Sequence, residues 1–219
     1  MNVHKFFEVY GYIFPQDIAA QIDYRTYEKN EAIVRAGEEI DGLYFLVQGK
    51  YTVSSLEITG KELLLRYCQK PAILGDIELF EQCVVQSNCI AAETCEFVFI
   101  PKQVYEQQLK YEAAFVQLLL KDLAYKLRTC TVLSRVNALS AVSVRLAAYF
   151  CTVETSNKND YITTSSLDEV AALIGTTKRH VNRILKQWIE KGLISRDGDT
   201  IQILDWATMN VYSEQVRFE

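Results

Sequence analysis

The side chains best suited to chemistry in this 219-residue sequence form a cationic group near its C-terminal end. Its members are Thr177, Lys178, Arg179, Asn182, Arg183 and Lys186. No acidic residue lies among residues 176–186. Arginine can donate two parallel hydrogen bonds to a guanine edge, asparagine can pair with an adenine edge, and lysine neutralises phosphates. This group therefore favours binding of double-stranded DNA.

Two short helical patterns separated by Gly175 must position these side chains. Each has an apolar face, formed by Val170, Ala171 and Ile174 in the first and by Val181, Ile184, Leu185 and Trp188 in the second. Ser166 with Glu169 matches a capping box, which predicts that a helix begins at Leu167. Glycine at 175 permits the left-handed turn that ends this helix. A short helix with an apolar back and a basic front fits a DNA major groove.

A predicted β-hairpin follows the helical pair. The second helix begins near Thr176 or Thr177, and β-prone runs then flank an Asp197-Gly198 turn between residues 192 and 203. A helix pair with a solvated basic face and no ligand is the alternative. Capping, turn, charge and hairpin signals together favour a winged helix-turn-helix.

The first part of the chain has a different pattern. Residues 1–25 suggest a helical lead-in, and short β-like runs punctuated by glycine extend from about Tyr24 to Pro101. They cover residues 32–37, 42–49, 50–60, 61–68, 72–75 and 89–101. Alternation is clear in Leu43, Phe45 and Val47. Strands of this length and spacing predict an antiparallel sandwich or roll.

A helical segment without proline or glycine is predicted from residue 103 to residue 139. Apolar side chains recur at alternating spacings of four and three, as in a two-stranded coiled coil, at Val116, Leu120, Leu123, Leu127 and Cys130. A helix inside a larger core could show the same spacing. We expect a homodimer, because a parallel dimer places two recognition helices about 34 Å apart on DNA.

Composition sets outer limits on function. The hydrophobic share of 49% and aromatic share of 11% are those of a globular protein. Net charge is −5, but Lys and Arg nearly balance Asp and Glu from Ala141 onward, so most of the surplus acid precedes the predicted DNA-binding region. The absence of an apolar run of about 18 residues, or of a signal-peptide pattern, predicts a cytoplasmic protein with no membrane partner.

Five short motifs spread over almost the whole chain resemble one family. They are Gly37-Glu38-Glu39, Leu43-Tyr44-Phe45-Leu46-Val47-Gln48-Gly49, Leu74-Gly75-Asp76-Ile77-Glu78-Leu79-Phe80, Ile174-Gly175 and Val181-Asn182-Arg183-Ile184-Leu185. This combination resembles the cyclic-AMP receptor protein / fumarate-nitrate regulator (CRP/FNR) family of bacterial regulators.

The resemblance implies an α+β fold in three parts. Residues 1–102 would form a cyclic-nucleotide-binding-like β-roll, a double-stranded β-helix that senses an effector. Residues 103–140 would form the dimerisation helix, and residues 141–219 the winged helix-turn-helix. The resemblance further implies a homodimeric transcriptional regulator that binds a two-fold symmetric operator and contacts RNA polymerase.

The family's recognition residues carry over with one departure. Lys178, Arg179 and Arg183 fall where the family reads bases and phosphates, and Arg183 matches an arginine used on guanine. Asn182 suits adenine or phosphate. Many members have a glutamate where this chain has Arg179, so we expect a different operator. We interpret His180 as an ordinary helix residue near the backbone.

The effector site departs further from the family pattern. Its candidate residues are Gly75, Asp76, Ile77, Glu78, Gln86, Ser87 and Cys130. Cyclic-nucleotide binders carry an Arg-Ser pair, whose arginine neutralises the cyclic phosphate, where this chain has Gln86 and Ser87. Asp76 and Glu78 add negative charge nearby, and Cys130 replaces a threonine that contacts adenine. We therefore expect an effector other than cyclic AMP.

Three sensing hypotheses remain open. An iron–sulfur cluster is disfavoured because the first cysteine is Cys68, whereas the oxygen-sensing branch uses an N-terminal cysteine cluster. Thiol redox sensing would use Cys83, Cys89 and Cys95, which repeat every six residues and would share one face of a single strand, or Cys130 at the dimer seam. An unidentified small molecule, or no ligand, is the third.

Two other classes of function are alternatives. A cupin enzyme would need several histidines in the β segment, but the sequence has only His4 and His180, and it has no nucleophile elbow, P-loop or dinucleotide fingerprint. We accordingly expect no catalytic residue, no enzyme activity and no metal site. The other alternative is a protein-interaction module without DNA binding, which the basic helix disfavours.

Overall fold

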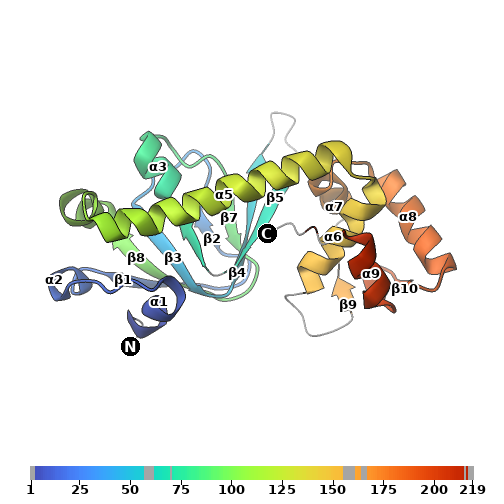
Figure 1. Ribbon diagram of the computed structural model, residues 1–219, viewed down its shortest axis with the longest axis horizontal. Helices are drawn as coiled ribbons and strands as arrows, with labels where there is room; N and C mark the ends of the chain where they lie inside the picture. The colour runs from blue at the N-terminus through green and yellow to red at the C-terminus, as the bar shows by residue number, and fades with distance from the viewer. Residues whose placement is uncertain are drawn as a thin grey trace. The chain divides into compact units, whose positions relative to one another are not determined.

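The computed structural model describes residues 3–56, 62–69, 71–154, 161–163, 167–214 and 216. Contacts divide the chain into two compact units. One comprises Met1–Lys61 and Leu65–Arg128, and the other comprises Glu62–Leu64 and Thr129–Glu219. Figure 1 shows that sheets dominate the first unit and helices the second.

The first unit is a β-roll preceded by helices α1 (Val3–Tyr10) and α2 (Gln16–Ala19). One four-stranded sheet has the order β1 (Asp23–Tyr27), β8 (Cys95–Pro101), β3 (Gly42–Gln48) and β6 (Ala72–Leu74). The other has the order β2 (Ala32–Val34), β7 (Asn88–Ala91), β4 (Lys50–Leu56) and β5 (Glu62–Gln69). Antiparallel pairing of β3 with β8 and β6, and of β7 with β2 and β4, confirms the predicted roll.

The predicted run 89–101 is two strands that belong to different sheets. Cys89 lies in β7 and Cys95 in β8, while Cys83 follows the short helix α3 (Asp76–Glu81). A bend between the two strands moves the chain from one sheet to the other. Cys83, Cys89 and Cys95 therefore do not lie on a single strand, and loops intervene between them.

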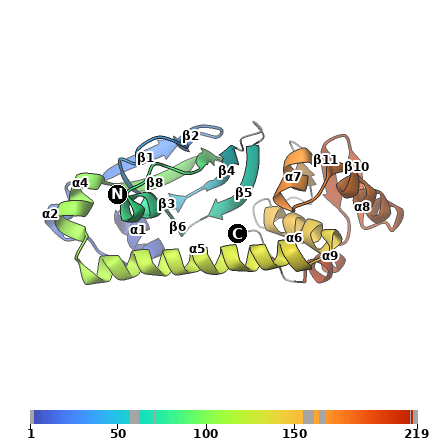
Figure 2. The same ribbon diagram turned by 90° about the horizontal axis from the view of Figure 1, so that it is seen from above.

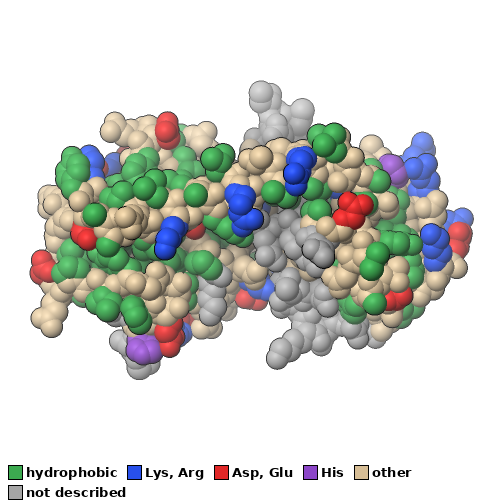
Figure 3. Space-filling model, viewed as in Figure 1, with side chains coloured by type: hydrophobic (Ala, Val, Ile, Leu, Met, Phe, Trp, Pro, Cys, Tyr) green, Lys and Arg blue, Asp and Glu red, His purple; other side chains and the backbone are tan. Residues whose placement is uncertain are grey.

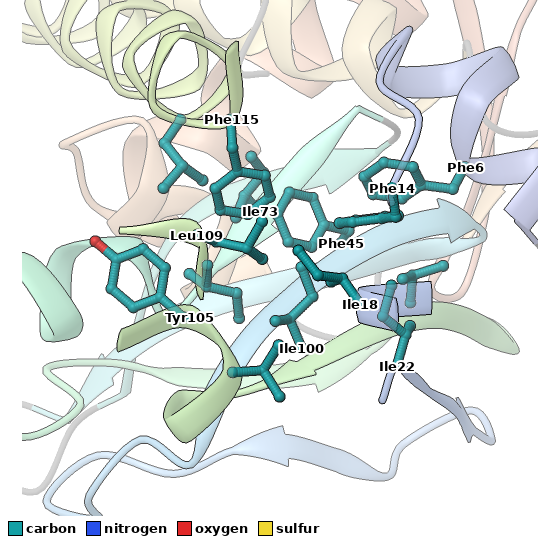
Figure 4. Packing of buried hydrophobic residues seen from close by; sticks show 14 of the residues in the cluster. Phe6, Phe14, Ile18, Ile22, Phe45, Ile73, Ile100, Tyr105, Leu109 and Phe115 are labelled. Atoms are coloured by element: carbon teal, nitrogen blue, oxygen red, sulfur yellow. The ribbon is translucent and has the colours of Figure 1, made fainter. Parts of the chain in front are cut away.

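Strand β3 is buried on both faces, so its alternation divides side chains between two cores. Leu43, Phe45 and Val47 join a cluster with residues of α1, α4 (Lys102–Val104) and α5 (Ala113–Leu139). Tyr44 and Leu46 join the second cluster, between the sheets. Figure 4 shows the first cluster, where the rings of Phe6, Phe14, Phe45 and Phe115 pack together.

The predicted continuous helix from residue 103 is interrupted, and that prediction is wrong. After β8 the chain forms α4 (Lys102–Val104) and a π-helical turn, η1 (Tyr105–Leu109), and only then α5 (Ala113–Leu139). Glu112 ends the interruption, because its carboxylate accepts hydrogen bonds from the backbone N–H groups of Phe115 at 2.6 Å and Ala114 at 3.3 Å. An acidic N-terminal cap starts α5 where no glycine or proline marks a boundary.

Helix α5 has two dissimilar sides. Phe115 and Leu119 are buried against the first core, and Figure 2 shows the first half of α5 running beside the β-roll. The predicted seam lies on the other side, where Leu120 is 55% and Leu127 71% exposed. In Figure 3, hydrophobic side chains alternate with Lys and Arg along this exposed side.

The second unit contains the helical hairpin and wing. Its elements are α6 (Val142–Glu154), β9 (Tyr161–Thr163), α7 (Leu167–Leu173), α8 (Lys178–Glu190), β10 (Ile194–Asp197), β11 (Thr200–Ile203) and α9 (Trp206–Tyr212). The hairpin β10–β11 is confirmed, and Asp197 pairs with Thr200 around the turn. Strand β9, which the sequence pattern did not reveal, adds a third strand beside β11.

The C-terminal helix α9 packs within its own unit. It contacts α6, Met209 is fully buried, and the ring of Tyr212 lies 6.2 Å from that of Trp188.

Among the described helices of both units, none is long and apolar enough to cross a membrane.

Candidate nucleic-acid interface

The turn between α7 and α8 is held by a buried arginine from α6. Arg145 is 7% exposed, and its Nη1 donates hydrogen bonds to the carbonyl oxygens of Ile174 and, at 3.3 Å, Gly175. Burial lowers the pKa of Arg145. Gly175 has a φ of +62°, as predicted, and an added Cβ would lie 3.1 Å from Arg145 Nη1. A cation on the two carbonyls that directly follow α7 therefore fixes the turn.

The limits of both helices follow local capping. Helix α7 begins at Leu167 as predicted, although Ser166 of the expected capping box lies outside the described residues. Thr177 is the N-cap of α8, and its hydroxyl oxygen accepts a hydrogen bond from the backbone N–H of His180 at 3.3 Å. The side chain of Thr177 thus starts the recognition helix, which is a structural task in addition to any DNA contact.

The back of α8 anchors it in the core of its unit. Val181, Ile184, Leu185 and Trp188 are buried, and the ring of Trp188 lies 6.1 Å from that of Phe150 in α6. The opposite face carries all the predicted contact residues. Lys178, Arg179, Arg183 and Lys186 are exposed, and Asn182 is half-buried. Figure 3 shows this gathering of Lys and Arg side chains over α8, with a histidine among them.

Arg183, the predicted base-reading residue, has a partner on its own helix. Its Nη2 lies 2.7 Å from Nε2 of His180. Nδ1 of the same imidazole lies 3.4 Å from the Thr176 hydroxyl. The imidazole ring of His180 thus contacts the guanidinium of Arg183, a contact that the interpretation of His180 as an ordinary helix residue did not include.

Asn182 links the recognition helix to the wing. Its Oδ1 accepts a hydrogen bond from Arg196 Nη1 at 2.9 Å, and its Nδ2 donates to the backbone carbonyl of Lys178 at 3.1 Å. Arg196 also donates from Nε to the carbonyl of Gly198 at 2.9 Å. The amide nitrogen and the amide oxygen of Asn182 therefore each have one partner within the protein already.

One of the predicted effector residues at the start of α3, Asp76, belongs to a buried ion-pair cluster. Gly75 has a φ of +90°, and a Cβ there would collide with the carbonyl oxygen of Gly42. Asp76 is 1% exposed, and Lys126 of α5 donates to both its carboxylate oxygens at 2.7 Å. Lys126 also pairs with Asp122 at 2.9 Å and donates to the carbonyl of Ile73 at 2.8 Å.

This cluster puts a cation of the protein itself on the Asp76 carboxylate. Burial alone would lower the pKa of Lys126, but the carboxylates of Asp76 and Asp122 outweigh it and raise that pKa. The cluster fastens α5 to α3 without any ligand. Each oxygen of the Asp76 carboxylate therefore already accepts a hydrogen bond from within the protein.

The other effector candidates differ in their exposure. Gln86 is exposed and donates from Nε2 to the Val84 carbonyl at 2.7 Å, Ile77 is 45% exposed, and Ser87 is half-buried. Burial raises the pKa of Glu78, whose carboxylate accepts from the backbone of Gln86. Cys130 is exposed and belongs to the second compact unit, whereas the others belong to the first.

A cavity of about 530 Å³ lies between α3 and the α4–η1 segment. Of the predicted effector residues, only Glu78 lines it. Its other lining residues include Phe80, Val84, Lys102 and Tyr105. The predicted pocket beside Gln86 is thus not this cavity, and an uncharged, exposed Gln86 does not fit a cyclic phosphate.

Burial divides the cysteines into two groups. Cys68, Cys89, Cys95 and Cys151 are buried. Burial raises the pKa of the Cys68, Cys89 and Cys95 thiols, that of Cys95 to about 11. Cys83 is half-buried and Cys130 is exposed. Within the part of the chain that the structure describes, no three His, Cys, Asp or Glu side chains are grouped as a metal site.

Four residues with clear tasks were missed from the sequence: Arg145, His180, Arg196 and Lys126. Two had a local signal, because His180 precedes Arg183 by three helical positions and Asp122 precedes Lys126 by four, spacings that bring side chains together. Arg145 and Arg196 had no local signal, because their hydrogen-bond partners Ile174 and Asn182 are separated from them by 29 and 14 residues.

Comparisons with known proteins agree with this architecture. The cyclic nucleotide-binding domain family matches residues 24–112, and the Crp-like helix-turn-helix domain family matches residues 144–212. The cAMP-activated global transcriptional regulator CRP of Haemophilus influenzae is 25% identical over 183 residues, covering 81% of this chain and 82% of that protein. The anaerobic regulatory protein of Bacillus subtilis is 28% identical over 182 residues, covering 79% and 76%.

Solved structures of low sequence identity share the fold. A CRP-family transcriptional regulator from Thermus thermophilus has a TM-score of 0.73 at 19% identity, covering 89% of this chain and 98% of that one. The c-di-GMP responsive global regulator CLP of Xanthomonas campestris has a TM-score of 0.69 at 20% identity, covering 85% and 95%. The β-roll, the winged helical hairpin and both domain matches lead to the same conclusion. This chain belongs to the CRP/FNR family of DNA-binding transcriptional regulators.

Proposed function

We propose that the protein acts as a homodimer that binds a two-fold symmetric DNA operator, with α8 of each protomer in a major groove. The exposed face of α8 carries the proposal. It presents Lys178, Arg179, Arg183 and Lys186, while a fully apolar back fixes the helix in its unit. A rigid helix with a cationic front is what groove recognition requires.

The side chains divide by the chemistry they offer. Arg183 reads a guanine through the fork of its guanidinium. Lys178, Arg179 and Lys186 supply the charge that neutralises phosphates, which sets affinity more than sequence preference. Arg179 stands where many family members have glutamate, so the operator differs at the base pair this position faces.

Dimerisation through α5 is supported by the exposed half of the helix. Leu120 and Leu127 are largely exposed in the single chain, and Val116 and Leu123 are half-buried. A second copy of α5 would cover these side chains in a coiled-coil seam and remove their apolar surface from water. RNA polymerase is proposed as a further partner on the family resemblance alone.

The effector is proposed to be a small molecule other than cyclic AMP. Gln86 carries no charge for a cyclic phosphate, and Asp76 is already paired with Lys126. The fold itself tolerates other ligands, since CLP of Xanthomonas campestris is described as c-di-GMP responsive. Thiol sensing is the second candidate, through Cys83 or Cys130, because Cys151 is buried, and the buried thiols of Cys68, Cys89 and Cys95 have raised pKa values and so little reactive thiolate.

Selection of bound duplexes from a random library, with the thiols reduced and oxidised in parallel, tests the proposal. A two-fold symmetric motif enriched in both states would support DNA reading and reject the thiol switch. Enrichment in one state only would support the switch. If neither state enriched a motif, a second selection with extracted bacterial small molecules would follow, and failure there would overturn sequence-specific DNA binding.

A further inference from the structure

We infer that His180 is a positioning residue for Arg183, and that it sets how sharply the protein distinguishes a guanine at the Arg183 position. This inference rests on the proposed function, in which Arg183 reads a base. Its basis is the 2.7 Å contact between His180 Nε2 and Arg183 Nη2. Residues three positions apart on a helix lie on the same face, so the contact needs no distortion of α8.

The chemistry of the contact fixes the state of the imidazole. A guanidinium has only N–H donors, so Nε2 of His180 must accept and therefore carries a lone pair. A neutral imidazole then has its proton on Nδ1, which lies 3.4 Å from the Thr176 hydroxyl oxygen. Thr176 is itself held in the turn, because its backbone N–H donates to the Ala171 carbonyl at 2.8 Å.

The result is a chain of contacts from the turn between α7 and α8 to the guanidinium of Arg183. Thr176 orients the imidazole of His180, and the imidazole holds the guanidinium of Arg183 on the exposed face of α8. The contact uses one of the five N–H donors of arginine, so others are left for O6 and N7 of guanine. Arg183 is exposed, and without this partner it would sample many rotamers that have to be ordered on binding.

His180 therefore affects base discrimination through Arg183. An imidazole that supports the guanidinium before DNA arrives lowers the ordering cost for the correct base. On random DNA the same support has little value, because phosphate contacts tolerate many side-chain positions. Loss of His180 should thus reduce the ratio of operator affinity to random-DNA affinity, and it should do so only while Arg183 is present.

A double-mutant cycle on the full chain tests this, using a duplex enriched by the selection above and a scrambled duplex. His180→Ala is expected to weaken operator binding about three- to tenfold, the worth of one hydrogen bond, with little change on the scrambled duplex. His180→Gln restores a carbonyl acceptor at similar reach and should bind within about twofold of the wild type. In an Arg183→Ala background, His180→Ala should have no further effect.

The outcomes separate the two proposals. If His180→Ala weakens the operator complex equally with and without Arg183, His180 acts independently and the inference is overturned, while the proposed function stands. If Arg183→Ala itself leaves discrimination unchanged, the proposed base reading by Arg183 fails and the inference fails with it. Fluorescence of Trp188, which lies on α8, confirms that each variant keeps the helix in place.

Discussion

Arg196 of the wing donates a hydrogen bond to Asn182 of α8 across 2.9 Å, so the wing and the recognition helix are joined side chain to side chain. The same guanidinium holds the carbonyl of Gly198 in the hairpin turn. The planar fork of arginine suits this double task, because it presents several donors in one rigid arrangement. The wing is thereby placed relative to the residues proposed to contact DNA.

Replacing Arg196 by alanine should weaken operator binding by about 0.5–1.5 kcal/mol, because the wing and the Asn182 amide lose their common partner. The free energy of unfolding should change by less than about 0.5 kcal/mol, since the pair lies at the surface. Fluorescence anisotropy and urea titrations measure the two quantities. Arg196→Lys is the matched control: it keeps the charge but not the fork, so binding as tight as wild type would show that charge alone matters.

Lys126→Met should destabilise the β-roll unit by about 3–5 kcal/mol near neutral pH, because it leaves the buried Asp76 carboxylate without its cation. The raised pKa of Lys126 determines the pH dependence. The contribution of Lys126 to the free energy of unfolding is fully present below the pKa of the unfolded state, about 10.4. It is lost as the pH rises through the higher pKa of the folded state.

Urea titrations of wild type and Lys126→Met, followed by far-ultraviolet circular dichroism, should therefore differ most below about pH 10.4 and converge only as the pH rises through the raised folded pKa of Lys126. The chain supplies an internal control. Its two tryptophans, Trp188 and Trp206, both lie in the second unit, so their fluorescence transition should be unchanged. An equal stability of the two proteins at pH 7 would contradict the role given to the ion-pair cluster.

Leu127→Glu should dissociate the proposed dimer without unfolding the chain, because Leu127 is 71% exposed in the single protomer. A carboxylate in a coiled-coil seam would be desolvated against its symmetry mate. Light scattering should show the mass falling from twice 25.1 kDa to 25.1 kDa. Lys121→Glu lowers the net charge by two, against one for Leu127→Glu, at an exposed position outside the seam, and it should leave the dimer intact.

Alkylation of the thiols at pH 8 should distinguish the cysteines. Cys95, whose pKa is raised to about 11, and the buried Cys68 and Cys89 should react at least about tenfold more slowly than Cys83. Cys130 should react faster in Leu127→Glu than in the wild type, because the seam no longer covers it. Mass spectrometry after timed quenching gives the rates. Rapid modification of Cys95 would reopen a role for the buried thiols in sensing.

Local chemistry made much of the second unit predictable. A capping residue, Gly175 at positive φ and the turn at Gly198 each mark a boundary that backbone geometry requires, and α7, α8 and the hairpin follow them. The interruption at residues 110–112 was not predictable in this way. Residues 103–139 lack glycine and proline, and the break depends on burial of Tyr105 and Leu109 in a core formed by distant strands.

The candidate site was predictable as a set of residues and not as a set of contacts. The basic face of α8 follows from helical spacing, and the structure places all six predicted residues there or at its cap. The links from Arg196 to Asn182 and from Arg145 to Ile174 depend on tertiary packing, which periodicity does not encode. For the effector region, alignment by motif groups Gln86 of the first compact unit with Cys130 of the second, and this grouping stays a prediction.

The central claim, that Arg183 reads a base, is tested most directly by the effect of Arg183→Ala on operator and scrambled duplexes at one fixed salt concentration. The account predicts a loss of about 1–3 kcal/mol in operator binding with little change on scrambled DNA, and Lys186→Ala should instead weaken both about equally. Equal weakening of the two duplexes by Arg183→Ala would make Arg183 a phosphate contact and contradict the claim.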